Sequence, residues 1–201
     1  MSMSGRHTAS LALVERVASL ADAAEATRAI RAASVLFIAA LTAAAAQISI
    51  PLPFTDVPFT FQPMVVLIGG LALGPRLGLA SQVLYLAAGI AGLPVFAAST
   101  VLPPGAARLF GPTGGYLMAY PLAAFLTGYL GERGLDRRYL TSFAAMLAGL
   151  SVIFASGVLW LSTLVGAQAA LATGFYPFIL ADAVKLALAA GVMPGLWKLL
   201  R

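Results

Sequence analysis

The chain has 201 residues, of which 61% are hydrophobic and only 9% are charged. Soluble domains carry about 25% charged residues, so the composition predicts an integral membrane protein. The absence of cysteine excludes disulfide bonds. The net charge of +5 is compatible with an anionic partner. The positions of the basic residues, however, indicate membrane topology. We therefore expect no nucleic-acid partner.

The first 31 residues do not resemble a signal peptide, because they lack a basic start followed by an apolar core and their charges are mixed. Residues 11–31 have the pattern of a short amphipathic helix. We expect residues 1–31 to form a cytoplasmic leader or a disordered tail, with contact to the membrane surface as the alternative. Residues 32–201 then form the membrane-embedded domain.

The remaining chain contains apolar stretches that are each near the roughly 20 residues needed to cross a bilayer as a helix. The second is short and ends at LGPRLG (73–78), and the fifth is long, so both are expected to tilt or to extend past the membrane boundary. The sequence predicts an all-α protein with six transmembrane helices in a compact bundle. These spans lie at about 32–50, 61–74, 76–93, 113–131, 139–165 and 175–195.

The linkers between these stretches predict the orientation. Most basic residues fall before the first span, in alternate linkers and after the sixth span, whereas the opposite linkers carry only Arg108 and the acid Asp56. Because cytoplasmic loops are enriched in Lys and Arg, both termini are predicted to lie in the cytoplasm, with the chain crossing the cytoplasmic membrane. The basic residues that set this side are Arg16, Arg28, Arg31, Arg76, Arg133, Arg137, Arg138, Lys198 and Arg201.

Two outward linkers differ from simple turns. Residues 51–63 contain four prolines and three phenylalanines, and residues 93–116 are long and rich in Gly, Pro and Ala. Long loops are usually functional or disordered, and the Phe, Val and Leu of these loops argue against disorder. We predict ordered loops that cover a site on the outer side.

The stretch FILADAVKLAL (178–188) places an acid and a base inside the sixth span. Asp182 and Lys185 are three residues apart and share one helix face, and charges inside a membrane usually face a bundle interior or a polar cavity. The pair can be a structural ion pair. It can also bind a ligand, with Asp182 accepting from N–H groups and Lys185 donating to a carbonyl or carboxylate. No other acid lies within an expected span, which favours the ligand site.

Further polar residues lie on the outer side. Gln62 can bind a ligand or join two helices, whereas for Gln82 we favour an interhelical hydrogen bond. GPTGGY (111–116) can receive a ligand at a helix N-terminus or form only a tight turn, and Tyr116 can stack on an apolar ring. Arg108 can meet a ligand carboxylate or remain solvated.

The first span carries a small-xxx-small pattern twice in AALTAAAA (39–46), as Ala39/Ala43 and Ala40/Ala44. Such a face lets another helix approach closely. It can serve internal packing or dock a second membrane protein.

Known catalytic constellations do not fit the sequence. The lone histidine, His7, lies in the tail, Asp182 has no second buried acid as a partner, and no metal cluster or Walker A loop is present. We therefore expect no enzyme, no metal and no cofactor, and no ability of this chain alone to drive transport by ATP hydrolysis.

Four segments in order resemble the BioY family, the biotin-specific substrate-binding (S) components of energy-coupling factor transporters. The resemblance covers about residues 32–200 and lies in QISIPLPFTDVPFTFQP (47–63), GLPVF (92–96), GPTGGYL (111–117) and PFILADAVKLALAA (177–190).

The resemblance implies that biotin binds near the outer face of a six-helix bundle, beneath the two loops, and that Asp182 and Lys185 contact it. It also implies that Ala39 and Ala43 dock on a transmembrane coupling protein, which two ATP-binding subunits complete. Biotin would be the transported substrate rather than a cofactor. High-affinity uptake of biotin is the expected function.

The chemistry of biotin agrees with these residues. Phe59, Phe96 and Tyr116 can pack its apolar parts, as in most small-molecule pockets. Arg108 is the candidate for the carboxylate, although its loop departs from the glycine-rich loop expected in the family, so Ser99 or Thr100 can contribute instead. The alternatives are a stand-alone transporter or facilitator that self-associates, an S component for a different vitamin, and an intramembrane enzyme.

Overall fold

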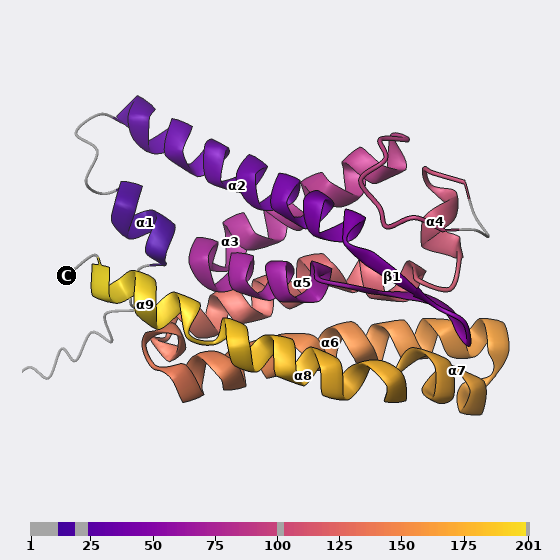
Figure 1. Ribbon diagram of the computed structural model, residues 1–201. Helices are drawn as coiled ribbons and strands as arrows, with labels where there is room; N and C mark the ends of the chain where they lie inside the picture. The colour runs from indigo at the N-terminus through magenta and orange to yellow at the C-terminus, as the bar shows by residue number, and fades with distance from the viewer. Residues whose placement is uncertain (1–11, 19–23, 100–102, 200–201) are drawn as a thin grey trace, which may run out of the picture.

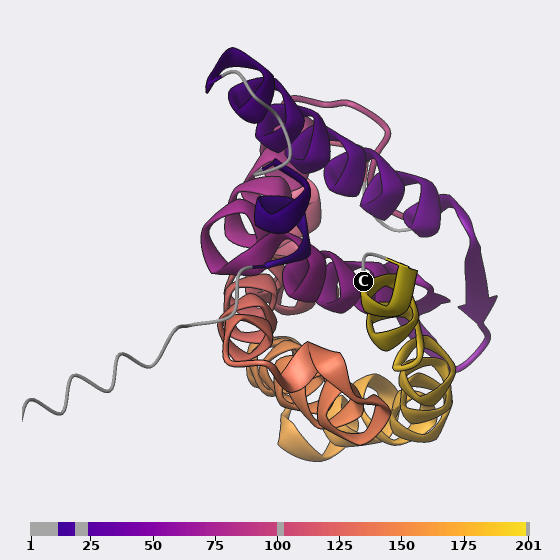
Figure 2. The same ribbon diagram turned by 90° about the vertical axis from the view of Figure 1, so that its left-hand side faces the viewer.

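The computed structural model describes residues 12–18, 24–99 and 103–199, which form helices and one short hairpin of strands (Figures 1 and 2). Figure 1 shows α1 and α9 at one end of the bundle, and the hairpin, α4 and α7 at the other. The elements in chain order are α1 (Leu13–Ala18), α2 (Ala24–Gln47), β1 (Ser49–Leu52), β2 (Thr55–Thr60), α3 (Gln62–Ile90), α4 (Ala107–Phe110), α5 (Gly114–Glu132), η1 (Leu135–Arg137), α6 (Tyr139–Val165), α7 (Ala167–Gly174), α8 (Tyr176–Ala189) and α9 (Val192–Leu199).

Four helical stretches in the described part of the chain are long and apolar enough to cross a membrane. Helix α6 coincides with the fifth expected span, and α5 closely matches the fourth. The last stretch runs from α7 to α9 and is interrupted at Phe175 and at residues 190–191. The four stretches are Glu25–Gln47, Gln62–Ile90, Tyr139–Val165 and Ala167–Leu199.

Helix α3 is not straight, because the chain folds back on itself at Gly74. This glycine has φ +79° and ψ 177°, which is outside the helical region, and Pro75 follows it. The side chains of Gln62 and Tyr85 are hydrogen-bonded at 2.6 Å, whereas 23 residues of straight helix would separate them by about 35 Å. The break predicted within LGPRLG is therefore confirmed, and α3 consists of two short arms that lie side by side.

Glycines let α3 and α5 pack closely. A Cβ at Gly70 would lie 2.5 Å from the Ala124 carbonyl oxygen, and a Cβ at Gly128 would lie 2.5 Å from the Pro75 nitrogen. Real Cβ atoms do not approach so closely, so both positions require glycine. Small residues at such crossings are typical of helix packing in membranes.

The described part of the expected leader packs on the bundle. Helix α1 places Val14 against Ile38 and Leu73, and Arg31 forms an ion pair with Glu15 at 2.6 Å. Helix α2 starts within residues 1–31, since this stretch contains good helix formers and no proline. Residues 1–11, which include His7, and residues 19–23 lie outside the described residues.

The linker between α2 and α3 folds into an antiparallel hairpin of β1 and β2, with Ser49 opposite Thr60. We call residues 49–60 the lid hairpin. The sequence predicted an ordered loop here, and the structure adds two strands, which contain Pro51 and Pro58. A ribbon of two strands has two open edges, and edge strands tolerate proline.

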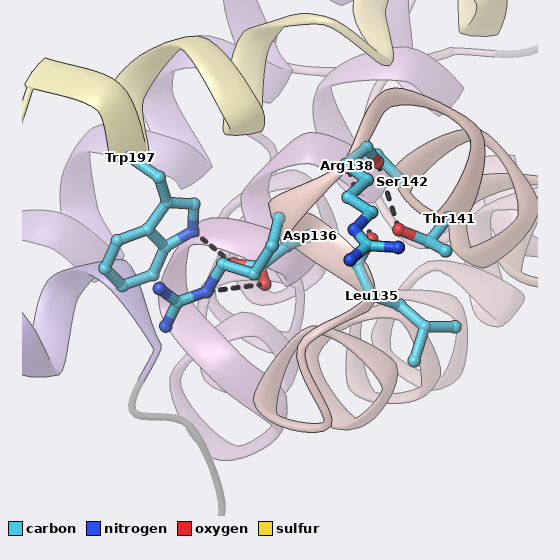
Figure 3. Close-up of polar contacts among 7 residues, drawn as sticks. Leu135, Asp136, Arg138, Thr141, Ser142 and Trp197 are labelled. Atoms are coloured by element: carbon cyan, nitrogen blue, oxygen red, sulfur yellow. Dashed lines mark hydrogen bonds and ion pairs between the residues drawn. The ribbon is translucent and has the colours of Figure 1, made fainter.

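A buried carboxylate holds α9 against the linker between α5 and α6 (Figure 3). The indole N–H of Trp197 donates to Asp136 Oδ2 at 2.5 Å, and Arg137 Nε lies 3.3 Å from Asp136 Oδ1. The Arg137 guanidinium also lies 3.4 Å above the Trp197 ring. Burial raises the pKa of Asp136, while the hydrogen bond from Trp197 and the charge of Arg137 oppose that rise.

Asp136→Ala should therefore destabilise the fold, because the Trp197 N–H loses its acceptor. A hydrogen bond to a charged group is worth about 1.5–3 kcal/mol, so thermal unfolding in detergent should occur at a clearly lower temperature. Asp136→Asn keeps an oxygen acceptor and should lose less stability. An equal loss in both variants would contradict this role of the carboxylate.

Candidate ligand-binding site

A cavity of about 880 Å³, part of it open to solvent, lies beneath the lid hairpin. Side chains of β2, α3, α4, α5, α6, α8 and the segment after α3 line it. The cavity is therefore lined in part by residues of the two linkers that were predicted to cover a site, residues 51–63 and 93–116. Six of the seven residues proposed for ligand binding line it, namely Gln62, Phe96, Arg108, Tyr116, Asp182 and Lys185.

The acid and the base of α8 meet at the cavity wall. Asp182 and Lys185 are 4% and 7% exposed and form an ion pair. Lys185 Nζ also donates to the Thr60 carbonyl oxygen of the lid hairpin at 2.6 Å. In the described residues Asp182 Oδ1 has no hydrogen-bond partner apart from this ion pair. The pair thus braces the lid hairpin and leaves carboxylate acceptor capacity at the cavity.

Phe59, the seventh residue proposed for ligand binding, is not among the residues that line the cavity. Its ring packs against the Lys185 ammonium, which lies 4.0 Å from the ring centroid. A cation over an aromatic face is attracted by the ring quadrupole. Phe59 therefore positions Lys185 and does not form the wall of the cavity.

Gln62 and Gln82 differ as the sequence suggested. Gln62 lines the cavity and donates to the Tyr85 hydroxyl at 2.6 Å, and that hydroxyl donates to the Val95 carbonyl oxygen at 3.3 Å. Gln82 is fully buried and donates to Thr42 Oγ1 of α2 at 3.3 Å. The prediction of an interhelical hydrogen bond for Gln82 is confirmed, and Gln62 joins the two arms of α3 while it faces the cavity.

Arg108 is not solvated, although it lies in an outer loop. It is 8% exposed, donates to the Ala97 carbonyl oxygen and lines the cavity. Its Nε has no hydrogen-bond partner among the described residues. Burial lowers the pKa of Arg108, but an arginine keeps its charge. Ser99 also lines the cavity, whereas Thr100 lies outside the described residues.

The glycines of GPTGGY (111–116) serve close packing against α6. The Trp160 indole N–H donates to the Gly111 carbonyl oxygen at 2.9 Å, and Ser156 Oγ donates to the Gly115 carbonyl oxygen at 2.8 Å. A Cβ at Gly115 would lie 2.6 Å from the Ser156 carbonyl oxygen. The turn therefore fixes the start of α5, which carries Tyr116 at the cavity.

The sequence did not identify most of the inner wall. Tyr116 was expected, and its hydroxyl donates to the Gly174 carbonyl oxygen at 2.8 Å. Spacing of four residues from Tyr116 on α5 and from Asp182 on α8 would have found two others, since such residues share a helix face. The unpredicted wall residues include Leu117, Tyr120, Ile153, Phe154 and Phe178.

The proposed docking face of α2 needs a correction. Ala39 is 8% exposed and belongs to the buried core, and Ala43 packs against that core. Ala40 and Ala44 are exposed instead. Adjacent residues of a helix point about 100° apart, because a turn contains 3.6 residues, so the two small-residue pairs face different sides.

The site combines apolar walls with charged groups of both signs. Asp182 can accept N–H groups, and Arg108 can bind a carboxylate. Most small-molecule pockets are apolar with a few polar groups that fix orientation. The arrangement therefore suits a small molecule with an apolar ring, N–H donors and an anionic group.

Comparisons with known proteins agree on one family. The model of the BioY family matches residues 16–201. A protein of Pyrococcus horikoshii described as a probable biotin transporter BioY is 45% identical over 154 residues, which are 77% of this chain and 87% of that one. A biotin transporter BioY of Thermotoga maritima is 40% identical over 161 residues, covering 80% of this chain and 91% of that one.

A solved structure shares the fold. It is a crystal structure of the S-component for biotin from an ECF-type ABC transporter, with a TM-score of 0.78 and 26% sequence identity. The match covers 89% of this chain and 95% of that chain.

Lys185→Met should loosen the lid hairpin, because it removes the bond to Thr60 and the cation under which Phe59 packs. We expect the backbone amides of residues 49–60 to exchange with deuterium about tenfold faster, since a hydrogen bond from a charged group is worth about 1.5–3 kcal/mol. Lys198→Met, at an exposed position of α9, is the matched control. Unchanged exchange in the Lys185 variant would show that other contacts hold the hairpin.

Proposed function

Because this chain belongs to the BioY family, we propose that it binds biotin and takes it up across the cytoplasmic membrane as the S component of an energy-coupling factor transporter. The observation that carries the proposal is the cavity beneath the lid hairpin, where Asp182, Lys185 and Arg108 converge between apolar walls. Biotin has a ureido group that can pair with Asp182 and Lys185, a carboxylate that can pair with Arg108, and an apolar ring that can pack against the apolar walls. A transported substrate also needs no catalytic group.

In the proposed binding mode, Asp182 accepts a ureido N–H of biotin. Lys185 uses two of its three N–H groups on Asp182 and Thr60, so one remains for a ligand oxygen. Arg108, whose Nε has no hydrogen-bond partner among the described residues, binds the carboxylate. Phe96 and Tyr116 pack the apolar ring.

We also propose that the chain crosses the membrane six times with both termini in the cytoplasm. The two arms of α3, together with α2, α5, α6 and the α7–α9 stretch, supply six helical segments. The basic residues Arg76, Arg133 and Arg137 lie in the α3 turn and at the α5–α6 linker, whereas the lid hairpin lies at the end away from α1 and α9 (Figure 1). Cytoplasmic loops are enriched in basic residues, so this arrangement supports an outward-facing lid.

The proposed partners are a transmembrane coupling protein and two ATP-binding subunits. No ATP-binding loop occurs in the sequence, so energy must come from other chains. We place the docking surface on the face of α2 where Ala40 and Ala44 are exposed. Small residues there allow a partner helix to approach closely.

Calorimetric titration of the purified chain in detergent should show tight binding of biotin and none of thiamine or riboflavin. Asp182→Asn should weaken biotin binding about ten- to a hundredfold, because a hydrogen bond to a charged acceptor is worth about 1.5–3 kcal/mol. Asp136→Asn makes the same change at the other end of the bundle and should bind as the wild type does. Failure of the folded wild type to bind biotin, or equal binding of another vitamin, would overturn the proposed substrate.

Replacing both Ala40 and Ala44 by leucine should prevent assembly with the coupling protein, because two larger side chains keep the partner helix away. Biotin binding by the isolated variant should stay unchanged, since neither residue lines the cavity. Co-purification of the coupling protein with the tagged chain measures assembly. Ala155→Leu, at an exposed alanine of α6, should still assemble, and assembly of the double variant would exclude this docking face.

A further inference from the structure

Tyr120 is a tyrosine of the cavity wall whose hydroxyl has no hydrogen-bond partner among the residues that the structure describes. It is 4% exposed and lines the cavity, and its hydroxyl, which makes no hydrogen bond to any described residue, is not one of the fully buried unpaired atoms. The neighbouring tyrosines differ, because Tyr85 donates to Val95 and Tyr116 donates to Gly174. Of these three tyrosine hydroxyls, only that of Tyr120 lacks a partner among the described residues.

The hydroxyl of a mostly buried tyrosine usually has a hydrogen-bond partner, so a hydroxyl that faces the cavity without one is available to a ligand. If this side chain only filled space, a phenylalanine would serve equally well at this position. The position of the ring is well fixed, because it stacks on Tyr85 with centroids 6.3 Å apart. Tyr85 is itself fixed by Gln62 and by the edge of Phe96, whose ring centroid is 5.5 Å away. The hydroxyl is therefore presented to the cavity by a rigid support.

The place of Tyr120 along its helix matches that of Asp182. Tyr120 lies six residues after Gly114, the first residue of α5, and Asp182 lies six residues after Tyr176, the first residue of α8. At 1.5 Å per residue, each is about 9 Å from the start of its helix. Both Asp182 and Tyr120 line the cavity. Arg108, by contrast, comes from α4 in the outer loop.

We propose that the Tyr120 hydroxyl donates a hydrogen bond to the ureido oxygen of bound biotin, while Asp182 accepts the adjacent ureido N–H. This assignment rests on the proposed function and extends it to a residue that sets specificity. The ureido oxygen has two lone pairs, so it can accept from Tyr120 and from Lys185 together. Because Asp182 accepts an N–H group, it binds the ureido end of biotin. The ureido oxygen next to that N–H is then the acceptor for the Tyr120 O–H group. The carboxylate of biotin then lies toward Arg108.

The test is a titration of Tyr120→Phe with three ligands. With biotin, the variant should bind about five- to tenfold more weakly, the value of one hydrogen bond from a neutral donor. With 2-thiobiotin, whose sulfur accepts hydrogen bonds poorly, the wild type and the variant should differ by less than about twofold. With dethiobiotin, which keeps the ureido group and lacks the ring sulfur, the five- to tenfold difference should return.

Two controls separate this role from a structural one. Thermal unfolding of Tyr120→Phe without ligand should match the wild type, because the hydroxyl has no protein partner to lose. Tyr129→Phe, on the exposed face of the same helix, should bind all three ligands as the wild type does. Wild-type affinity of Tyr120→Phe for biotin, or the same loss for all three ligands, would overturn the assignment while leaving the proposed function intact. Absence of biotin binding by the wild type would overturn both.

Discussion

The arrangement of the site depends on the ammonium of Lys185. A charge among apolar helices is costly unless it is paired, and a buried ion pair is tolerated when further hydrogen bonds satisfy its atoms. Lys185 meets this requirement with Asp182 on its own helix and with the Thr60 carbonyl oxygen of the lid hairpin. A two-stranded hairpin is only marginally stable by itself. The contact that satisfies the charge therefore also holds the lid over the cavity.

Small residues and tight turns make the rest of the frame rigid around this contact. The reversal at Gly74 brings Gln62 beside Tyr85, and Gly70 and Gly128 allow α3 and α5 to approach each other closely. At the other end of the bundle, Trp197 joins α9 to Asp136 in the α5–α6 linker (Figure 3). Helices α5 and α8, which face each other across the cavity with Tyr120 and Asp182, are thus also connected at their distant ends. Their relative position is set at both ends of the bundle.

The sequence revealed features that depend on local spacing and missed those that depend on contacts between distant segments. Asp182 and Lys185 could be identified because three residues separate them within an apolar stretch, and the turn at Gly74 because glycine and proline follow one another. The burial of Arg108 could not be foreseen, since it depends on how the outer loop folds onto the cavity.

Similarly, the rotation of α2 about its axis decides that Ala39 faces the core and Ala40 faces outward. The sequence could not decide between them, because it contains a small-xxx-small pair at each position. The contact between Trp197 and Asp136 joins residues 61 positions apart, and no local pattern indicates it. The wall position of Tyr120 was within reach, since Tyr116 lies one helical turn before it. That its hydroxyl lacks a hydrogen-bond partner among the described residues could be found only from the structure, by comparison with the hydrogen bonds of Tyr85 and Tyr116.

The polar groups without partners at and near the cavity favour binding of a ligand that would supply those partners. The Arg108 Nε and the Tyr120 hydroxyl lack partners in the described structure, and Asp182 keeps acceptor capacity beyond its ion pair. A buried polar group without a partner raises the free energy of the empty protein. A ligand that satisfies these groups removes that cost, and rigid supports such as the Tyr85 ring reduce the ordering entropy that binding otherwise requires. Selectivity follows from the same geometry, because a ligand without matching donors and acceptors would bury these groups and leave them unpaired.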